Sequence, residues 1–107
     1  MVRQVNPREL SAILSSDAPA PQLLDVREPW ELDICRLDAA THIPMRRIPA
    51  DIERLDPDRP VVVICHHGIR SQQVALYLDH QGFRQVLNLR GGIDAWAHEV
   101  DPGMATY

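Results

Sequence analysis

The clearest indication of the fold is the sequence VVVICHHGIRS, residues 61–71. It begins with four β-branched residues, Val61 to Ile64, which directly follow Pro60. A short run that is apolar at every position is typical of a strand buried on both faces, as in a parallel sheet. The turn that follows contains Gly68, and a helix is expected to begin near Ser71. The stretch therefore predicts a strand, a tight loop and a helix within an α/β fold.

Strand patterns and helical patterns alternate along the rest of the chain. Further strands are predicted at residues 2–5, 22–26, 42–43 and 85–89, and helical stripes start at Leu10, Ile48, Val74 and Ile93. The segment from Asn6 to Glu9 supplies a capping side chain, a proline and a glutamate, which predicts a helix start. Gly82 is expected to end a helix in the left-handed conformation. This alternation indicates a mostly parallel sheet, in which ligands bind beyond the carboxyl ends of the strands.

Composition limits the classes of protein to which the chain can belong. Its 107 residues predict one domain, residues 1–107, and no apolar run has the length of about 20 residues that spans a bilayer. A formal net charge of −4 argues against a nucleic-acid-binding protein. Two cysteines and the absence of an apolar leader in the first ten residues favour a cytoplasmic location. All 11 basic residues are arginine, so lysine-based Schiff-base chemistry is excluded.

Several features of the loop favour the thiolate form of Cys65. The residue follows the predicted strand, where its side chain can face a crevice. Gly68 permits a tight turn that directs backbone N–H groups inward, and the start of the next helix adds partial positive charge. Arg70 adds a full charge, and His66 and His67 add partial positive character near neutral pH. A ring of this kind prepares a nucleophilic sulfur and also stabilises a persulfide, Cys–S–S⁻.

Two other interpretations of the same residues are available. A cysteine at the end of a buried strand is often a small core residue, but the glycine, the arginine and the helix start favour a reactive Cys65. A metal site is disfavoured, because adjacent histidines such as His66 and His67 cannot easily face one ion in a tight turn. No second cysteine–histidine pair stands at the spacing of metal ligands either, so no metal is expected.

Four segments resemble the motifs of rhodanese-like sulfurtransferases. CHHGIRS, residues 65–71, is similar to the active-site loop of that family, and LLDVREPWE, residues 23–31, to its strand that ends in Asp-Val-Arg. HIPM, residues 42–45, and LRGGIDAW, residues 89–96, resemble its Ile-Pro segment and its Gly-Gly helix start. The segments come in the family's order and span nearly the whole chain. A departure lies at residues 35–40, where the family often has Gly-His-Ile and Gly-Ala.

The resemblance implies an α/β fold whose central five-stranded parallel sheet is flanked by helices on both faces. It also implies a sulfurtransferase that moves sulfane sulfur from a small anionic donor, such as thiosulfate, to cyanide or a thiol through a Cys65 persulfide. Arg70, together with the histidines, would orient the sulfonate part of the donor, and no cofactor is expected. The substrate and persulfide loop would consist of His66, His67, Gly68, Ile69, Arg70 and Ser71.

The resemblance leaves two alternatives to small-molecule sulfur transfer. Related phosphatases have five residues between the cysteine and the arginine, whereas residues 66–69 are four, so the smaller loop disfavours phosphate. The ending AWAHEVDPGMATY resembles the tail of rhodanese domains that are fused to adenylating enzymes. A sulfur-carrier protein is therefore a possible acceptor, and the alternative function is a sulfur-carrying or regulatory module with little turnover on small donors.

Three further residues have a weaker connection with the site. Asp25 and Arg27 end a predicted strand beside the crevice, and a charge-assisted pair that fixes the loops is favoured over contact with substrate. Cys35 is either a resolving thiol for Cys65 or, as favoured here, a small partly buried residue.

Overall fold

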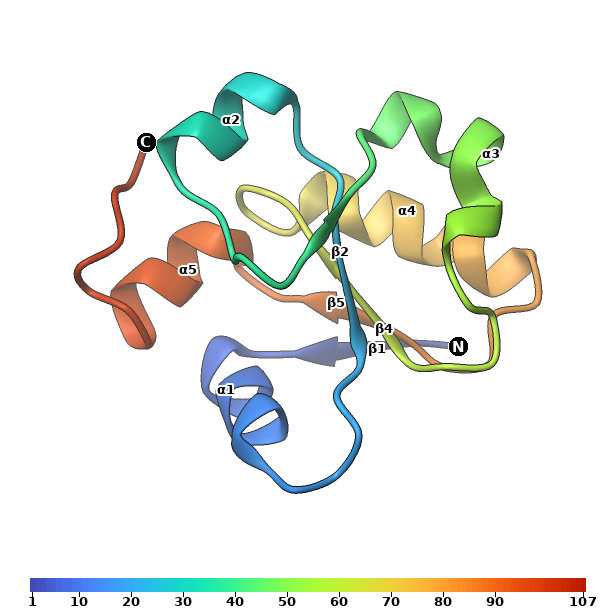
Figure 1. Ribbon diagram of the computed structural model, residues 1–107, viewed down its shortest axis with the longest axis horizontal. Helices are drawn as coiled ribbons and strands as arrows, with labels where there is room; N and C mark the ends of the chain where they lie inside the picture. Colours follow the sequence, from blue (N-terminus) through green and yellow to red (C-terminus); the bar gives the residue numbers. More distant parts are fainter.

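The computed structural model describes residues 1–107, which form one five-stranded sheet and five α-helices (Figure 1). The strands are β1 (Val2–Val5), β2 (Gln22–Asp25), β3 (Thr41–His42), β4 (Val61–Ile64) and β5 (Val86–Leu89). The helices are α1 (Pro7–Ser15), α2 (Pro29–Ile34), α3 (Ile48–Asp51), α4 (Ile69–His80) and α5 (Gly92–Glu99). Two 3-10 turns, η1 (Met45–Arg47) and η2 (Ile52–Arg54), flank α3. None of the helices is long and apolar enough to cross a membrane.

All strand pairs are parallel, and the strand order is β1-β5-β4-β2-β3. β4 lies in the middle, paired with β2 on one side and β5 on the other, and all four of its residues are buried. The predicted α/β fold with a parallel five-stranded sheet is therefore confirmed. Because β4 is central, the loop that follows it opens at the middle of the carboxyl edge of the sheet.

Two hydrophobic cores lie on opposite faces of the sheet, and β4 contributes to both. Val61, Val63 and Cys65 belong to one core, which includes residues of α3 and α4. Val62 and Ile64 belong to the other, which includes residues of α1 and α5. Side chains alternate between the two faces of a strand, so a run that is apolar at every position supplies both cores. Figure 1 shows α1 and α5 on one side of the sheet and α3 and α4 on the other.

The ends of two helices follow the sequence signals. Asn6 accepts from the Glu9 backbone N–H, and the Glu9 side chain accepts from the Asn6 N–H, which is the predicted capping box of α1. Gly82, with φ +91°, follows the end of α4 in the left-handed conformation, as predicted.

Two short helical segments differ from the sequence-based expectation. The stripe expected from Ile48 onward is divided between α3 and η2. Pro49 in the first turn of α3 has no N–H, so α3 does not continue η1 as one helix. α2 was not predicted, because a helix of six residues shows less than two turns of periodicity.

Candidate active site

The sulfur of Cys65 lies at the centre of the loop between β4 and α4. The backbone N–H of Gly68 points at Sγ over 3.1 Å, and that of Ser71 over 3.3 Å. The Cys65 thiol in turn lies 3.2 Å from the Ser71 hydroxyl oxygen. Gly68 has φ +96°, a left-handed conformation that turns its N–H into the loop. Cys65 is only 1% exposed, so it adjoins the hydrophobic core and still receives two N–H donors.

The start of α5 holds the carbonyl groups of the same loop. The N–H of Ile93 donates to the Cys65 carbonyl over 2.9 Å, and the N–H of Asp94 donates to the His66 carbonyl over 3.1 Å. A Cβ atom at Gly92 would overlap that His66 carbonyl, so the loop needs a glycine there to approach α5 so closely. With the carbonyls bound to α5, the N–H groups of the loop are free to face the sulfur.

A buried asparagine joins the loop to β5. The hydroxyl of Ser71 donates to Asn88 Oδ1 over 2.5 Å, and Asn88 Nδ2 donates to the Gly68 carbonyl over 3.2 Å. Because the Ser71 proton is directed to Asn88, the Ser71 oxygen is left to accept from the Cys65 side chain. Sequence reasoning missed Asn88, although a polar residue inside the apolar run VLNL was a usable signal.

Asp25 and Arg27 form a buried ion pair beside the loop. Arg27 Nη2 lies 2.7 Å from Asp25 Oδ2, and the two residues are 0% and 1% exposed. The same guanidinium donates to the Cys35 carbonyl over 2.8 Å and to the Tyr107 hydroxyl over 2.9 Å. Burial opposes the charge of Arg27, yet hydrogen bonds with Asp25 and Tyr107 raise its pKa. The pair joins β2, the end of α2 and residue 107.

Arg70 is bound by a carboxylate that the sequence analysis did not single out. Its two terminal nitrogens donate to the two oxygens of Glu31 on α2, each over 2.8 Å. The backbone N–H of Glu28 and the hydroxyl of Tyr107 also donate to Glu31, over 2.8 and 2.9 Å. Hydrogen bonds from Arg70 in particular lower the pKa of Glu31 to about 2, so this carboxylate is ionised at neutral pH. Glu31 lies within the segment REPWE, but its partner could not be read from that segment.

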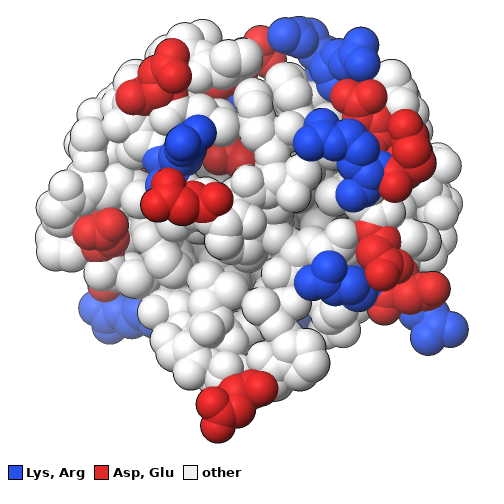
Figure 2. Space-filling model, viewed as in Figure 1, with Lys and Arg blue, Asp and Glu red and all other residues white.

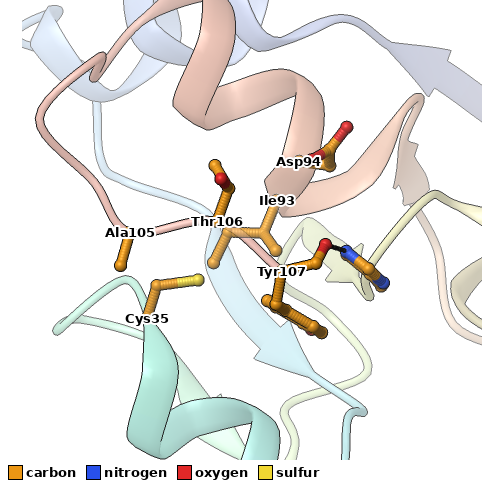
Figure 3. A pocket seen from close by; sticks show the side chains of 7 residues that line it. Cys35, Ile93, Asp94, Ala105, Thr106 and Tyr107 are labelled. Carbon is orange, nitrogen blue, oxygen red and sulfur yellow. Dashed lines mark hydrogen bonds between the residues drawn. The ribbon is translucent and has the colours of Figure 1, made fainter.

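The imidazole of His66 is stacked between two rings. The centroids of His67 and of Tyr107 each lie 3.8 Å from that of His66, with interplanar angles of 28° and 9°. His66 Nε2 lies 2.8 Å from the Tyr107 carbonyl oxygen, the contact drawn as a dashed line in Figure 3. Burial and the neighbouring His67 lower the pKa of His66, so its ring is neutral at pH 7. His66 therefore does not add the positive character that the sequence analysis expected of it.

His66, His67 and Asp94 are the residues of this region that a metal could contact. Their ligand atoms lie within 4.8 Å of one another. However, the two imidazole rings are stacked at 28°, so their in-plane lone pairs run side by side and do not converge on one point. His66 Nε2 is in addition engaged by Tyr107. This arrangement is that of a ring stack and not of a metal centre.

A shallow hollow lies between the loop, α2 and the last residues of the sequence (Figure 3). Cys35, Ile93 and Asp94 line it together with residues 105–107. Cys35 is a free thiol, its sulfur 4.0 Å from Arg27 Nη1, and it forms no disulfide with Cys65. The ring of Trp30 packs edge-on against that of Tyr107, with centroids 5.9 Å apart, and Trp30 is 60% exposed.

Comparison with known proteins identifies the family. The model of the rhodanese-like domain matches residues 6–99. The chain belongs to the rhodanese-like family. It is 40% identical over 105 residues to a sulfurtransferase of Allochromatium vinosum, which covers 98% of this chain and 97% of that protein. It is 38% identical over 86 residues to the thiosulfate sulfurtransferase GlpE of Shewanella oneidensis, with coverage of 80% and 84%.

Solved structures agree with this assignment. A crystal structure of a rhodanese-like domain protein from Staphylococcus aureus has a TM-score of 0.84 and 28% identity, and it covers 98% of both chains. Some relatives in sequence are longer, and the rhodanese-like chain spans only 30% of one and 26% of another. The names of the relatives of similar length support sulfurtransferase activity.

Proposed function

We propose that this rhodanese-like protein transfers sulfane sulfur through a persulfide on Cys65, taking it from a small anionic donor such as thiosulfate and passing it to cyanide or a thiol. The observation that carries the proposal is the pair of N–H groups, of Gly68 and Ser71, directed at Sγ. N–H donors stabilise anionic sulfur, and they are fixed before the reaction because α5 holds the loop carbonyls.

The proposed reaction has two displacements. In the first, the Cys65 thiolate attacks the outer sulfur of thiosulfate, an S–S bond forms on Cys65, and the bond to the sulfonate breaks. Sulfite leaves with the bonding electron pair, so charge and atoms balance. In the second, the acceptor attacks the outer sulfur of the persulfide, and Cys65 leaves as a thiolate. The cysteine is thus a nucleophile and then a leaving group, and both roles favour an ionised sulfur.

Access to the sulfur requires movement. Only 1% of Cys65 is exposed, and no open channel to it is found among the cavities of the protein. Residues 105–107 lie against His66 of the loop, and Tyr107 is stacked on its ring. We therefore include in the proposal a displacement of this segment, with the loop itself held in place by α5, when a donor binds.

A protein acceptor or a sulfur-carrying role is the second candidate. Trp30 is 60% and Ile69 is 71% exposed, and they immediately precede Glu31 and Arg70 in the sequence. Exposed aromatic and large aliphatic side chains at a site are typical of surfaces that bind proteins. Steady-state assays separate the two candidates, because rapid turnover with small donors supports the enzyme, whereas one sulfur per chain with slow release supports a carrier.

Mass spectrometry of the intact protein tests the proposal. After incubation with thiosulfate, we expect one added sulfur on the peptide that contains Cys65, and its removal by cyanide. Cys65→Ser should abolish the addition and all transfer to cyanide, while Cys35→Ser serves as the matched control and should retain both. Full activity of the Cys65→Ser variant, or sulfur found on Cys35 alone, would contradict a Cys65 persulfide.

A further inference from the structure

Arg27 and Arg70, the two arginines described at the site, each have a carboxylate partner. Arg27 pairs with Asp25 over 2.7 Å, and Arg70 pairs with Glu31 over 2.8 Å. His66 adds no charge at neutral pH, because burial lowers its pKa. Figure 2 shows the same trend on the surrounding face, where most arginines lie next to acidic side chains and no basic patch is formed. The site thus contains arginine without a strong excess of positive charge.

Glu31 is built into the structure as a fixed negative charge. It is 3% exposed, and both of its oxygens are occupied, by the two Arg70 nitrogens, the Glu28 N–H and the Tyr107 hydroxyl. A carboxylate with this number of donors is ionised and has no freedom to turn away from Arg70. The guanidinium of Arg70 is itself 35% exposed, so it faces both its partner and the solvent from which a donor comes.

We propose that Glu31 is a specificity-determining residue that offsets the charge of Arg70 and thereby favours sulfur donors of low negative charge, in which the sulfane sulfur is carried on an organic group, over dianionic thiosulfate. This inference rests on the proposed function of Cys65. In this proposal Glu31 does not contact the reacting sulfur. Glu31 acts through the electric potential that its charge creates at the place where the donor binds.

The surroundings of the ion pair fit a donor with an organic group. Trp30 precedes Glu31 and Ile69 precedes Arg70 in the sequence, and both apolar side chains are largely exposed. Trp30 packs edge-on against Tyr107 with ring centroids 5.9 Å apart, and the Tyr107 hydroxyl donates to Glu31, so an exposed indole ring lies on the residue that binds the ion pair. Thiosulfate has no apolar part that could use these contacts, whereas a thiosulfonate or an organic persulfide has one.

The charge of the donor gives the inference a distinctive signature. A Coulomb energy is proportional to the charge of the donor, so removal of one negative charge from the site changes the rate for a dianion by the square of the factor for a monoanion. A variant that only disturbs the fold changes both rates by a similar factor. Thiosulfate, a dianion, and benzenethiosulfonate, a monoanion, both deliver sulfane sulfur from a sulfonyl group and make a matched pair of donors.

The test measures kcat/KM for both donors in Glu31→Gln. We expect a rise of about tenfold for thiosulfate and about threefold for benzenethiosulfonate at low ionic strength, and smaller rises at 0.5 M salt. Glu53→Gln is the matched control, because it removes one charge from an exposed glutamate that makes no ion pair, and it should change neither rate by more than about twofold. Equal changes for the two donors, or a loss for thiosulfate, would overturn the inference.

A second variant keeps the test decisive if Glu31→Gln does not fold. In the double variant Glu31→Gln with Arg70→Gln, both charges are removed together, and thermal unfolding reports whether the fold is retained. If Glu31 offsets Arg70, the ratio of the two kcat/KM values stays within about twofold of the original ratio. A larger fall of the thiosulfate preference would show that Arg70 acts as a free cation and would overturn the inference. Failure of Cys65 to gain sulfur from either donor would instead refute the proposed function.

Discussion

The ion pair of Asp25 and Arg27 shows how single residues fix the position of the site. Both side chains are buried at the end of β2, and the guanidinium also binds Cys35 and Tyr107. The removal of one partner from a buried pair leaves an unpaired charge in a medium of low dielectric constant, which costs several kcal/mol. The pair therefore contributes to the position of the loops only as long as both members are present.

Asp25→Ala is expected to lower the free energy of unfolding by about 3–5 kcal/mol, because Arg27 is then buried without a counter-charge. Urea unfolding at pH 7 measures the change. The matched control is Asp51→Ala, which breaks the partly exposed i,i+4 pair with Arg47 over 3.2 Å and should cost about 0.5 kcal/mol. Similar losses in both variants would show that the buried pair has no special role.

The sequence predicted the residues of the loop itself and missed most of their partners. Cys65, Gly68 and Ser71 are close together in the chain, so their mutual arrangement follows from the strand, the glycine and the helix start. The missed partners are distant in the sequence: Glu31 is 39 positions from Arg70 and 76 from Tyr107, and Asn88 is 17 from Ser71. A single sequence gives no measure of such long-range contacts.

At the scale of elements, the start of α5 holds the loop between β4 and α4 in place. Two of its N–H groups bind the carbonyls of Cys65 and His66, and Gly92 allows the two segments to approach. The motif LRGGIDAW correctly predicted a helix here. The predicted ends of β4 and β5 also agree with the structure to within one residue. What the motif could not show is that this helix start packs on the loop, since that contact depends on the strand order.

Gly92→Ala is expected to cost about 3 kcal/mol or more, because its φ of +64° is strained for alanine and its Cβ would overlap the His66 carbonyl. The persulfide yield of Cys65 should fall as well, because the loop is displaced. Gly82→Ala separates the two causes: φ is +91°, but no atom lies within 4 Å of the added carbon, so only about 1 kcal/mol is expected. Thermal unfolding and intact mass measure both variants, and equal losses would exclude the overlap as a cause.

At the scale of the whole molecule, separate segments meet at the carboxylate of Glu31. Glu31 lies on α2, binds Arg70 at the start of α4, and accepts a hydrogen bond from the hydroxyl of Tyr107, the last residue of the sequence. The alternation of strands and helices predicted a mostly parallel sheet, and the resemblance to rhodanese-like proteins implied five strands with helices on both faces. The course of residues 101–107 over the loop could not be predicted, because this segment has no helical or strand periodicity from which its packing could be derived.

The pKa of Glu31 predicts how the stability of the molecule depends on pH. The folded pKa of about 2 lies below the ordinary value of 4.5, so the stabilisation is complete above pH 4.5 and is lost as the pH falls toward 2. This carboxylate alone should account for a decrease of about 3 kcal/mol in the free energy of unfolding. Urea unfolding between pH 5 and 2 should show a smaller decrease in Glu31→Gln. An identical decrease in both proteins would contradict the prediction.

The placement of Tyr107 has a practical consequence for fusion proteins. Any polypeptide continued after this residue would leave the surface next to His66, whereas one attached before Met1 would begin near Asp79 on α4, on another side of the molecule (Figure 1). An affinity tag at the tyrosine end would therefore lie beside the loop that holds Cys65, and a tag at the methionine end would not. For the same reason, a second domain joined behind the tyrosine would be held within reach of the sulfur.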